Sequence, residues 1–456
     1  MVEKPPSAPG RLPVVGHLPR LLRDPLGALS RWGQRPEGLC RLDVAGRTVC
    51  LVTSPEAVGQ VLATDSNRYR KADLVRDRLG NLQGGSLVLL EGEQWRDRRE
   101  TLQPAFTRQR VASAAPTVVE RTTERVRGWP DDSPVGLVAE CRSLVLDVLA
   151  RVLFGLEFDE EHTPIHRAAE DILARMDLQS VSTYLPESVP TPTNRRFRRA
   201  VATLHEELDA VVEDAAMADS HTRDGADGDG ERSLLEIMLG AGMEPATIRD
   251  ELIALLFAGY DSTATALSCA LALLGDSPGV QSAVRAELER VVGGRRPTPD
   301  DITGLPALNG VVKETLRLYP PQYLLFREPT ADTRLGGYRI DAGTVVVPAP
   351  WVVHRDEQHW REPTAFRPAR WLTGESALPG EHQPAQAAPE FAYIPYGVGS
   401  RHCLGAGMAD LTLRLAVAVL LQHRQVSLSG TLSVSAGPTL SVDDSLELRT
   451  VRDSLG

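Results

Sequence analysis

Residues 391–410 read FAYIPYGVGSRHCLGAGMAD and place a cysteine, Cys403, directly before an apolar run with helical spacing. Gly397 lies in the loop before the cysteine, where glycine permits tight or positive-φ backbone, and Gly405 follows it, where a missing side chain lets a flat group approach. A helix start offers unpaired N–H groups and a positive dipole end, which favour thiolate over thiol. Arg401 adds a nearby cation. The pattern predicts a sulfur whose surroundings favour its anionic form.

Three interpretations of this cysteine are consistent with the residues alone. Cys403 is a buried cysteine in a glycine-rich turn, or a nucleophile with His402 or His354 as its base. In the third interpretation it is a thiolate ligand of heme iron, where an anionic sulfur donates electron density to the metal and promotes cleavage of the O–O bond.

The segment from Tyr396 to Gly405 resembles the heme-binding signature of the cytochrome P-450 family, FxxGxRxCxG. Every specified position matches except the first, where Tyr396 replaces phenylalanine. The resemblance implies that Cys403 ligates the iron of heme b and that Gly397, Arg401 and Gly405 belong to the cofactor site. A tyrosine at the first position adds a hydroxyl near the sulfur, so we expect it to tune the iron.

A second motif, Glu314 and Arg317 in VVKETLRLYP, places an acid and a base three residues apart on one helix face. Alone, this spacing is typical of solvated ion pairs. By resemblance, Glu314, Arg317 and the later Arg370 form the set that holds the heme loop in place in the family. Their expected role is therefore structural, and a buried set of this kind needs further hydrogen-bond partners.

The predicted helix 246–275 is apolar except for a polar cluster in AGYDST, residues 258–263. This cluster resembles the distal-helix motif AGx(D/E)T(T/S) of the same family. The resemblance implies that Asp261 relays protons and that the hydroxyls of Ser262 and Thr263 assist at the bound oxygen. Ser262 stands where threonine is usual, and serine is freer about χ1 than threonine.

A fourth motif, in residues 92–106, resembles the family helix that carries WxxxR. Trp95 and Arg99 lie one turn apart, and by resemblance they bind a heme propionate through the indole N–H and the guanidinium. Arg327 and Arg401 match two further positions that pair with propionates in the family. The four motifs occur in family order, and the resemblance covers residues 10–450.

Composition describes an ordinary globular protein, with 456 residues, 42% apolar, 24% charged and a formal net charge of -11. The acidic balance disfavours binding to nucleic acid or anionic lipid through net charge. Five dispersed cysteines without a CxxC pair support neither a disulfide framework nor a structural zinc site. No apolar run reaches the roughly 18 residues that span a bilayer. We expect no nucleic-acid partner, no membrane span and a cytoplasmic location.

The predicted fold is mainly α with a small β portion, a single large cytochrome P-450 domain over 1–456. Prolines make 1–20 an extended lead-in, and 219–232 is predicted to be a mobile acidic loop. Alternation predicts a hairpin over 38–53, and strands and turns are expected over 334–348, a loop-rich stretch over 354–402 and a last helix over 404–423. Helices are expected near 55–64, 93–102, 141–154, 164–177, 194–218, 246–275, 278–292 and 308–318.

The resemblance implies a heme-thiolate monooxygenase that inserts one oxygen atom from O2 into a hydrophobic small molecule, such as a terpenoid or polyketide-like scaffold. The chain contains no flavin or iron–sulfur module, so electrons are expected from a ferredoxin and its reductase. Two alternative functions stay open. One is a heme-thiolate enzyme with other chemistry (peroxygenase, ring coupling or isomerisation), and the other is a non-catalytic protein that binds an apolar ligand or senses heme. The expected docking patch for the electron donor comprises Arg96, Arg98, Arg108 and Arg110.

By resemblance, the substrate pocket is lined by the loop 73–90, the segment 172–190, the distal helix and the turn 322–325. These stretches are largely apolar here. The expected pocket residues are Leu82, Leu87, Val88, Ala258, Tyr260, Tyr323 and Leu324.

Overall fold

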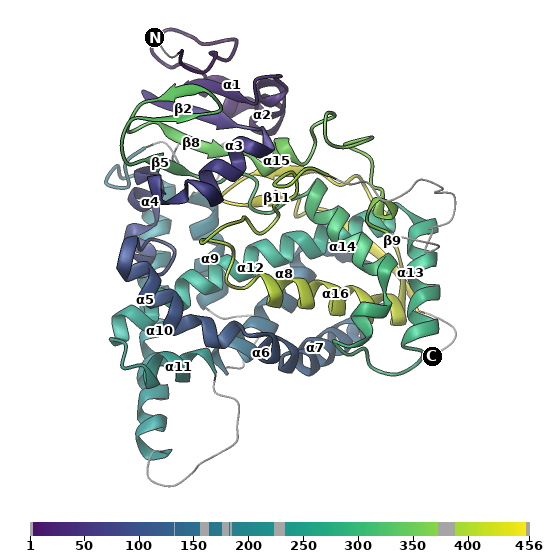
Figure 1. The fold of residues 1–456 in the computed structure, drawn as a ribbon. Coiled ribbons are helices and arrows are strands. Elements are labelled where there is room, and N and C mark those ends of the chain that lie inside the picture. Colours follow the sequence, from purple (N-terminus) through teal and green to yellow (C-terminus); the bar gives the residue numbers. More distant parts are fainter. Residues whose placement is uncertain are drawn as a thin grey trace.

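A computed structural model describes residues 3–131, 133–155, 164–175, 182, 185–222, 233–372 and 388–452. Helices dominate these ranges, and the predicted mainly α class with a small β portion is confirmed (Figure 1). The helices are α1 (Leu18–Arg23), α2 (Pro25–Gly33), α3 (Pro55–Gly59), α4 (Asp73–Gln83), α5 (Gly92–Leu102), α6 (Arg108–Ser113), α7 (Ala115–Gly128), α8 (Leu137–Leu149), α9 (Pro164–Arg175), α10 (Pro192–Thr222), α11 (Leu234–Gly240), α12 (Pro245–Gly275), α13 (Pro278–Val291), α14 (Pro306–Leu318), α15 (Pro350–Val353) and α16 (Ala406–His423).

Short strands form small sheets at the edges of the helical body. The largest, with strand order β1-β2-β8-β5-β3, lies beside the N-terminus in Figure 1. A three-stranded sheet has the order β4-β12-β9, and two hairpins pair β6 with β7 and β10 with β11. The strands are β1 (Leu39–Val44), β2 (Arg47–Val52), β3 (Tyr69–Lys71), β4 (Pro134–Gly136), β5 (Arg327–Pro329), β6 (Thr333–Leu335), β7 (Tyr338–Ile340), β8 (Val345–Pro348), β9 (Arg424–Ser429), β10 (Val434–Ala436), β11 (Leu440–Val442) and β12 (Glu447–Arg452).

The hairpin expected over 38–53 is present as β1 and β2, with Leu39 opposite Val52 and Val44 opposite Arg47. Ala45 and Gly46 make the turn, and both have positive φ, 49° and 79°. Two positive-φ residues give a tight turn that matches the twist of the flanking strands. β2 then pairs in parallel with β8, which joins this N-terminal hairpin to the distant C-terminal half.

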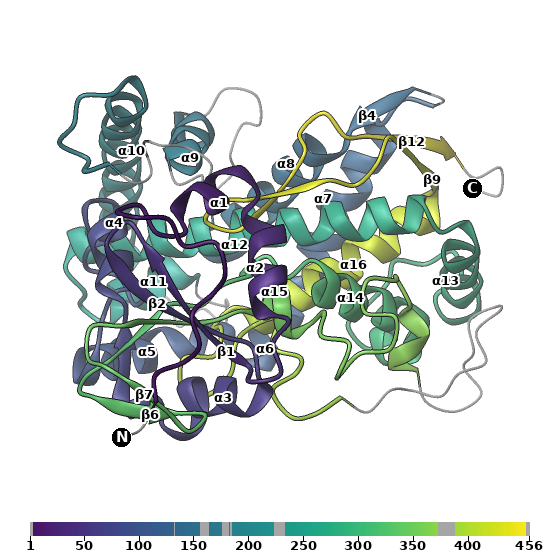
Figure 2. The same ribbon diagram turned by 90° about the horizontal axis from the view of Figure 1, so that it is seen from above.

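The helix α12 runs through the centre of the molecule and packs against α8, α10, α14 and α16 (Figures 1 and 2). By length and composition alone, this helix is long and apolar enough to cross a membrane. However, 72% of its most apolar 18-residue window is buried inside the protein. Its apolar character is therefore accounted for by core packing, because the surrounding helices cover it on most sides.

Several predicted boundaries were wrong. The lead-in ends earlier than expected because α1 begins at Leu18, with Pro19 in the first turn where its missing N–H costs nothing. The predicted loop 73–90 begins with the helix α4. The first residues of the predicted loop 219–232 continue α10 to Thr222, and the remainder, 223–232, lies outside the described residues. The helices α2, α6, α7, α11 and α15 were not predicted. Of these, α6, α11 and α15 are too short to show a helical apolar period clearly, whereas α2 and α7 have clear apolar faces that were overlooked.

Candidate functional site

The loop before α16 owes its path to two glycines. Gly397 and Gly399 have φ values of 69° and 77°, where a side chain is strained. Gly399 is also crowded, since a Cβ there would lie 2.0 Å from the backbone oxygen of Leu62, whereas Gly397 has open space. The loop closes when the Cys403 N–H donates to the Tyr396 carbonyl at 3.0 Å. The sulfur is thereby held two residues before Gly405, which precedes the first turn of α16.

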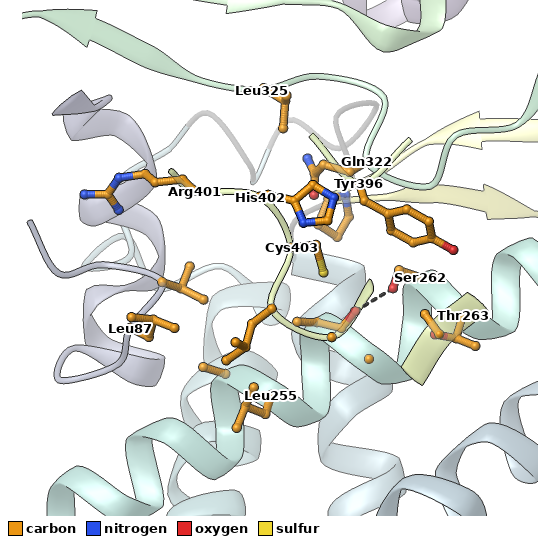
Figure 3. Close-up of a pocket in the computed structure, with 18 of the residues that line it drawn as sticks. Leu87, Leu255, Ser262, Thr263, Gln322, Leu325, Tyr396, Arg401, His402 and Cys403 are labelled. Atoms are coloured by element: carbon orange, nitrogen blue, oxygen red, sulfur yellow. Dashed lines mark hydrogen bonds between the residues drawn. The ribbon is translucent and has the colours of Figure 1, made fainter. Parts of the chain in front are cut away.

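Cys403 opens onto an apolar cavity of about 470 Å³ (Figure 3). The wall opposite the cysteine loop is one face of α12, and Figure 3 shows Ser262 and Thr263 on that helix across from the sulfur. Helices α4 and α8, segment 87–88 and the turn 322–325 form further parts of the walls. A smaller adjoining cavity of about 250 Å³ shares the sulfur and both hydroxyl residues. The arrangement leaves room for a flat group between the sulfur and α12.

The chemistry of the sulfur is governed by opposing effects. Burial raises the pKa of the Cys403 thiol, while the Gly405 N–H and the Arg99 charge lower it. A metal ion on the sulfur would deprotonate it outright. Among the described residues, no group of three or more His, Cys, Asp or Glu side chains could hold a metal ion. Among the described residues, Cys403 thus offers a single protein ligand, which fits an iron whose other ligands come from a porphyrin.

The histidines do not support a cysteine nucleophile. His354 is fully buried, and its Nε2 accepts the N–H of Ile394 at 2.9 Å. The lone pair of that nitrogen is therefore already used and is not free to take a proton from Cys403. Burial lowers the pKa of His354 to about 3. His402 neighbours the cysteine, but its pKa is also lowered, first by burial and then by Arg99. Its ring is hydrogen-bonded to the Cys403 backbone, and among the described residues no carboxylate is shown that would orient it as a base.

Four cations line one edge of the cavity: Lys71, Arg99, Arg327 and Arg401. Lys71 and Arg327 are direct partners across β3 and β5, where like charges destabilise a strand pair. Burial, followed by the neighbouring arginines, lowers the pKa of Lys71 to about 7 and that of Arg327 to about 10. Among the described residues, Glu91 is the carboxylate bonded to this group, through Arg401 and the Lys71 N–H. The surplus of positive charge fits a cofactor that carries carboxylates, as heme does.

Trp95 lies within this group. The Arg401 guanidinium lies 4.7 Å from the centre of its ring, a cation–π contact. Arg99 donates to the His402 carbonyl at 2.9 Å, which ties α5 to the cysteine loop. Lys71 was missed by the sequence reasoning. Its signal is a lysine within a buried, strand-like stretch, and only the pairing of β3 with β5 brings it to the cavity.

The three polar residues predicted on the distal helix point in different directions. Thr263 lines the cavity, and Ser262 lines it while donating its hydroxyl to the Ala258 carbonyl (Figure 3). Asp261 does not line this cavity and is 4% exposed. It accepts the hydroxyl of Thr439, and Arg142 lies 3.9 Å from its other oxygen. Burial raises the pKa of Asp261, and these two partners lower it.

Glu314 and Arg317 form a fully buried pair on α14, with two contacts of 2.9 Å. Arg370 donates to Glu314 at 3.0 Å, and so does the indole N–H of Trp371 at 2.9 Å. Arg317 also donates to the His354 carbonyl at 2.6 Å. Every polar atom of the pair thus has partners, which a buried ion pair requires. Through His354 and its bond to Ile394, the set reaches the cysteine loop.

Tyr396 lies beside the sulfur, but its hydroxyl has no hydrogen-bond partner among the described residues. Among the described residues, therefore, no hydrogen bond joins this hydroxyl to Cys403, and its effect on the iron stays a prediction. Burial raises the pKa of Tyr396, and the nearby Cys403 raises it further.

Most of the predicted pocket residues line the cavity, and two do not. Leu82 and Tyr260 are 1% exposed and pack in the helical core. Tyr260 is displaced because α12 presents the stripe 251, 255, 258 and 262 to the cavity, and residue 260 falls on another face. Sequence reasoning missed Glu251, which lies on that stripe. Leu87, Val88, Ala258, Tyr323 and Leu324 line the cavity as predicted.

Comparisons with known proteins agree with this geometry. The profile of the family described as Cytochrome P450 matches residues 5–435. Cyclooctatin synthase of Streptomyces melanosporofaciens is 32% identical, over 94% of this chain and 94% of its own length. Cyclooctat-9-en-7-ol 5-monooxygenase of the same organism is 31% identical, over 91% and 88%. Pentalenene oxygenase of Streptomyces avermitilis is 26% identical, over 92% and 91%.

Proposed function

We propose a substrate and an electron source on the premise that this chain belongs to the cytochrome P450 family, which is shown by the family profile and by its relatives. Members bind heme b iron through a cysteine, and the chain is a monooxygenase. In our proposal it inserts oxygen from O2 into a terpenoid, as a tailoring step of secondary metabolism. The observation that carries this proposal is the apolar cavity that opens directly onto Cys403.

Residues of this chain divide the work around the cofactor. Cys403 is the proposed iron ligand, and Lys71, Trp95, Arg99, Arg327 and Arg401 are the proposed partners of the propionates. When bound, heme supplies the activation of O2 at its iron. Gly399 and the Glu314 set keep the cysteine loop in the shape that presents the sulfur.

The proposed proton path runs through Asp261. Its carboxylate is joined to Thr439, which lines the smaller cavity together with Ser262 and Thr263. On the other side, Arg142 connects it to Asp444, whose side chain is 72% exposed. A buried acid with one contact toward solvent and one toward the cavity has the geometry of a proton relay.

Terpenoid size and polarity suit the cavity. Its walls come mainly from leucine, valine and alanine side chains of α4, α8, α12 and the turn 322–325. A second cavity of about 650 Å³ shares Leu74, Leu324 and Phe326 with the main cavity. We propose that this second cavity is the entrance channel for the substrate. Two relatives, cyclooctat-9-en-7-ol 5-monooxygenase and pentalenene oxygenase, are named for the oxygenation of terpenoid skeletons.

Electrons are proposed to come from a ferredoxin and its reductase in the cytoplasm. Arg96 and Arg108 are exposed near the cysteine side, where α6 packs against α16. Arg110 is half-buried and stays in the proposed patch. Arg98, in contrast, was wrongly assigned to this patch, because it donates to Glu251 at 2.6 Å inside the protein.

The test is spectroscopic and then chemical. Reduced protein exposed to carbon monoxide should show the strongly red-shifted Soret band of a cysteinate-bound heme, and Cys403→Ser should abolish it. Turnover of a panel of terpenes and terpenoid alcohols with NADPH, ferredoxin and reductase should then yield products carrying label from ¹⁸O2. Product formed with peroxide but never with the reductase system would contradict the proposal, and so would an unshifted band.

A further inference from the structure

Glu251 lies on α12 in the wall of the main cavity, on the same helix face as Leu255, Ala258 and Ser262. These positions are spaced three or four residues apart and so lie above one another along the helix. Glu251 has no exposed surface. A charged residue in an apolar wall is costly to bury without a partner for each of its oxygens.

The two carboxylate oxygens of Glu251 are treated differently. Oε1 accepts the Leu87 N–H at 2.7 Å and the Arg98 guanidinium at 2.6 Å. Oε2 is buried and has no hydrogen-bond partner among the described residues. Because a buried acceptor without a partner is costly, and more so if it is charged, this oxygen calls for a partner that the described residues do not supply.

Anchoring of the segment 84–90 does not explain the free oxygen. The adjacent Asp250 anchors the same segment, since its Oδ2 accepts the Gly85 N–H at 2.8 Å. Its Oδ1 accepts from Arg249 at 3.1 Å, so both oxygens of Asp250 are used, and Asp250 does not line the cavity. Glu251 therefore differs from Asp250 in two ways that a ligand contact requires. It lines the cavity, and one of its carboxylate oxygens has no partner among the described residues.

We propose that Glu251 binds a hydroxyl group of the substrate through Oε2, so that the substrate is a terpenoid alcohol and not a hydrocarbon. This inference rests on the proposed function. Ala258, which flanks the space above Cys403, is seven residues from Glu251, or about 10 Å along the helix. The hydroxyl and the oxidised carbon thus lie at opposite ends of the molecule. An earlier hydroxylation, or a cyclisation that ends in capture of water, must supply this substrate.

The chemistry of the site favours an alcohol over other polar groups. A carboxylate in the ligand would be repelled by Glu251. Arg98 already balances the charge of Glu251, so an ammonium would bring an uncompensated charge into an apolar cavity. A hydroxyl donates to the ionised carboxylate and accepts from the protonated acid. Burial raises the pKa of Glu251 to about 7, with Arg98 and the Leu87 N–H lowering it and Asp250 raising it, so both forms occur near neutrality. Because Oε2 is buried, the proposal requires that the bound molecule displace the side chains that cover this oxygen.

The experiment measures ligand affinity without turnover. Ferric holoenzyme is titrated with cyclododecane and cyclododecanol, which share one carbon skeleton, and binding is followed by the shift of the heme absorption band. We expect the ratio of the two Kd values to favour the alcohol about tenfold more in the wild type than in Glu251→Leu. Asp250→Asn, the matched control, should keep the wild-type ratio. Ratios that agree within about twofold in wild type and Glu251→Leu would overturn the inference.

The variant Glu251→Gln provides a second test in case Glu251→Leu does not fold. Its Oε1 stays with the Leu87 N–H and Arg98, so the amide NH2 occupies the place of Oε2. At pH 8.5 this variant should bind cyclododecanone more tightly than the wild type by about fivefold or more, because an amide donates to a carbonyl and a carboxylate repels it. An unchanged cyclododecanone affinity would count against a ligand at this oxygen. If the cyclododecanone affinity is unchanged but the holoenzyme still shows the red-shifted carbon monoxide band, only this inference fails. The proposed function would then still stand.

Discussion

Thr439 donates its hydroxyl hydrogen to the carboxylate of Asp261, across 178 residues of sequence. Thr439 lies in the turn between β10 and β11, and Asp261 is on α12. The acid of the distal helix is therefore turned toward the C-terminal hairpin and not toward the main cavity. In the proposed function, the threonine hydroxyl is the group that connects this acid with the space beside Cys403.

Removing this hydroxyl should uncouple oxygen consumption from product. Thr439→Val keeps the shape but not the hydrogen bond, and we expect about a tenfold fall in product per NADPH, with a larger solvent isotope effect. Asp261→Asn should lower kcat by about 10²–10³, within the range of general acid catalysis. Substrate Kd, measured by the heme band, should stay unchanged. A Thr439→Val variant with wild-type coupling would remove this residue from the path.

Breaking the buried ion pair on α14 should destabilise the protein strongly. Glu314→Ala leaves Arg317 and Arg370 without their carboxylate, and a change of this kind costs about 3–5 kcal/mol. Denaturant unfolding measures the loss. Asp332→Ala removes an exposed partner of Arg339 and should cost under about 1 kcal/mol. Similar losses in the two variants would contradict the structural role assigned to Glu314.

The two glycines of the cysteine loop should differ in tolerance. Gly397→Ala strains a positive-φ residue in open space, a cost of about 1–2 kcal/mol. Gly399→Ala adds a clash with the Leu62 carbonyl, which is backbone and cannot rotate away. We expect Gly397→Ala to retain most of its heme and Gly399→Ala to lose most of it, as measured by heme content per protein. Equal heme content would show that the crowding at Gly399 is relieved by loop movement.

Replacing Lys71 should have opposite effects on the stability of the apoprotein and on its affinity for heme. Its pKa is lowered from about 10.5 to about 7 by burial, so the unfolded chain binds more protons between these values. Apoprotein stability should then rise as pH increases from 7 to 10. Lys71→Met should stabilise the apoprotein, flatten this pH dependence and weaken heme binding, as followed by thermal unfolding and heme titration. Stronger heme binding in the variant would argue against propionate pairing.

The sequence alone was sufficient where the relevant residues are close together along the chain. The Cys403 loop, the Glu314–Arg317 spacing and the polar cluster of α12 each lie within about ten residues. Turn glycines and helical spacing govern such segments directly. The alternating hairpin of β1 and β2 could be predicted for the same reason.

Tertiary structure decided which side chains meet across the fold. Lys71 joins the cations only through the pairing of β3 with β5, and Thr439 reaches Asp261 only through the C-terminal hairpin. Arg98 turns inward because Glu251, 153 residues away, offers a buried partner. Local periodicity predicts a helix but does not specify which of its faces will be covered, so Leu82 and Tyr260 were placed wrongly. Contacts between distant segments depend on how whole elements pack, and this packing is a property of the complete chain.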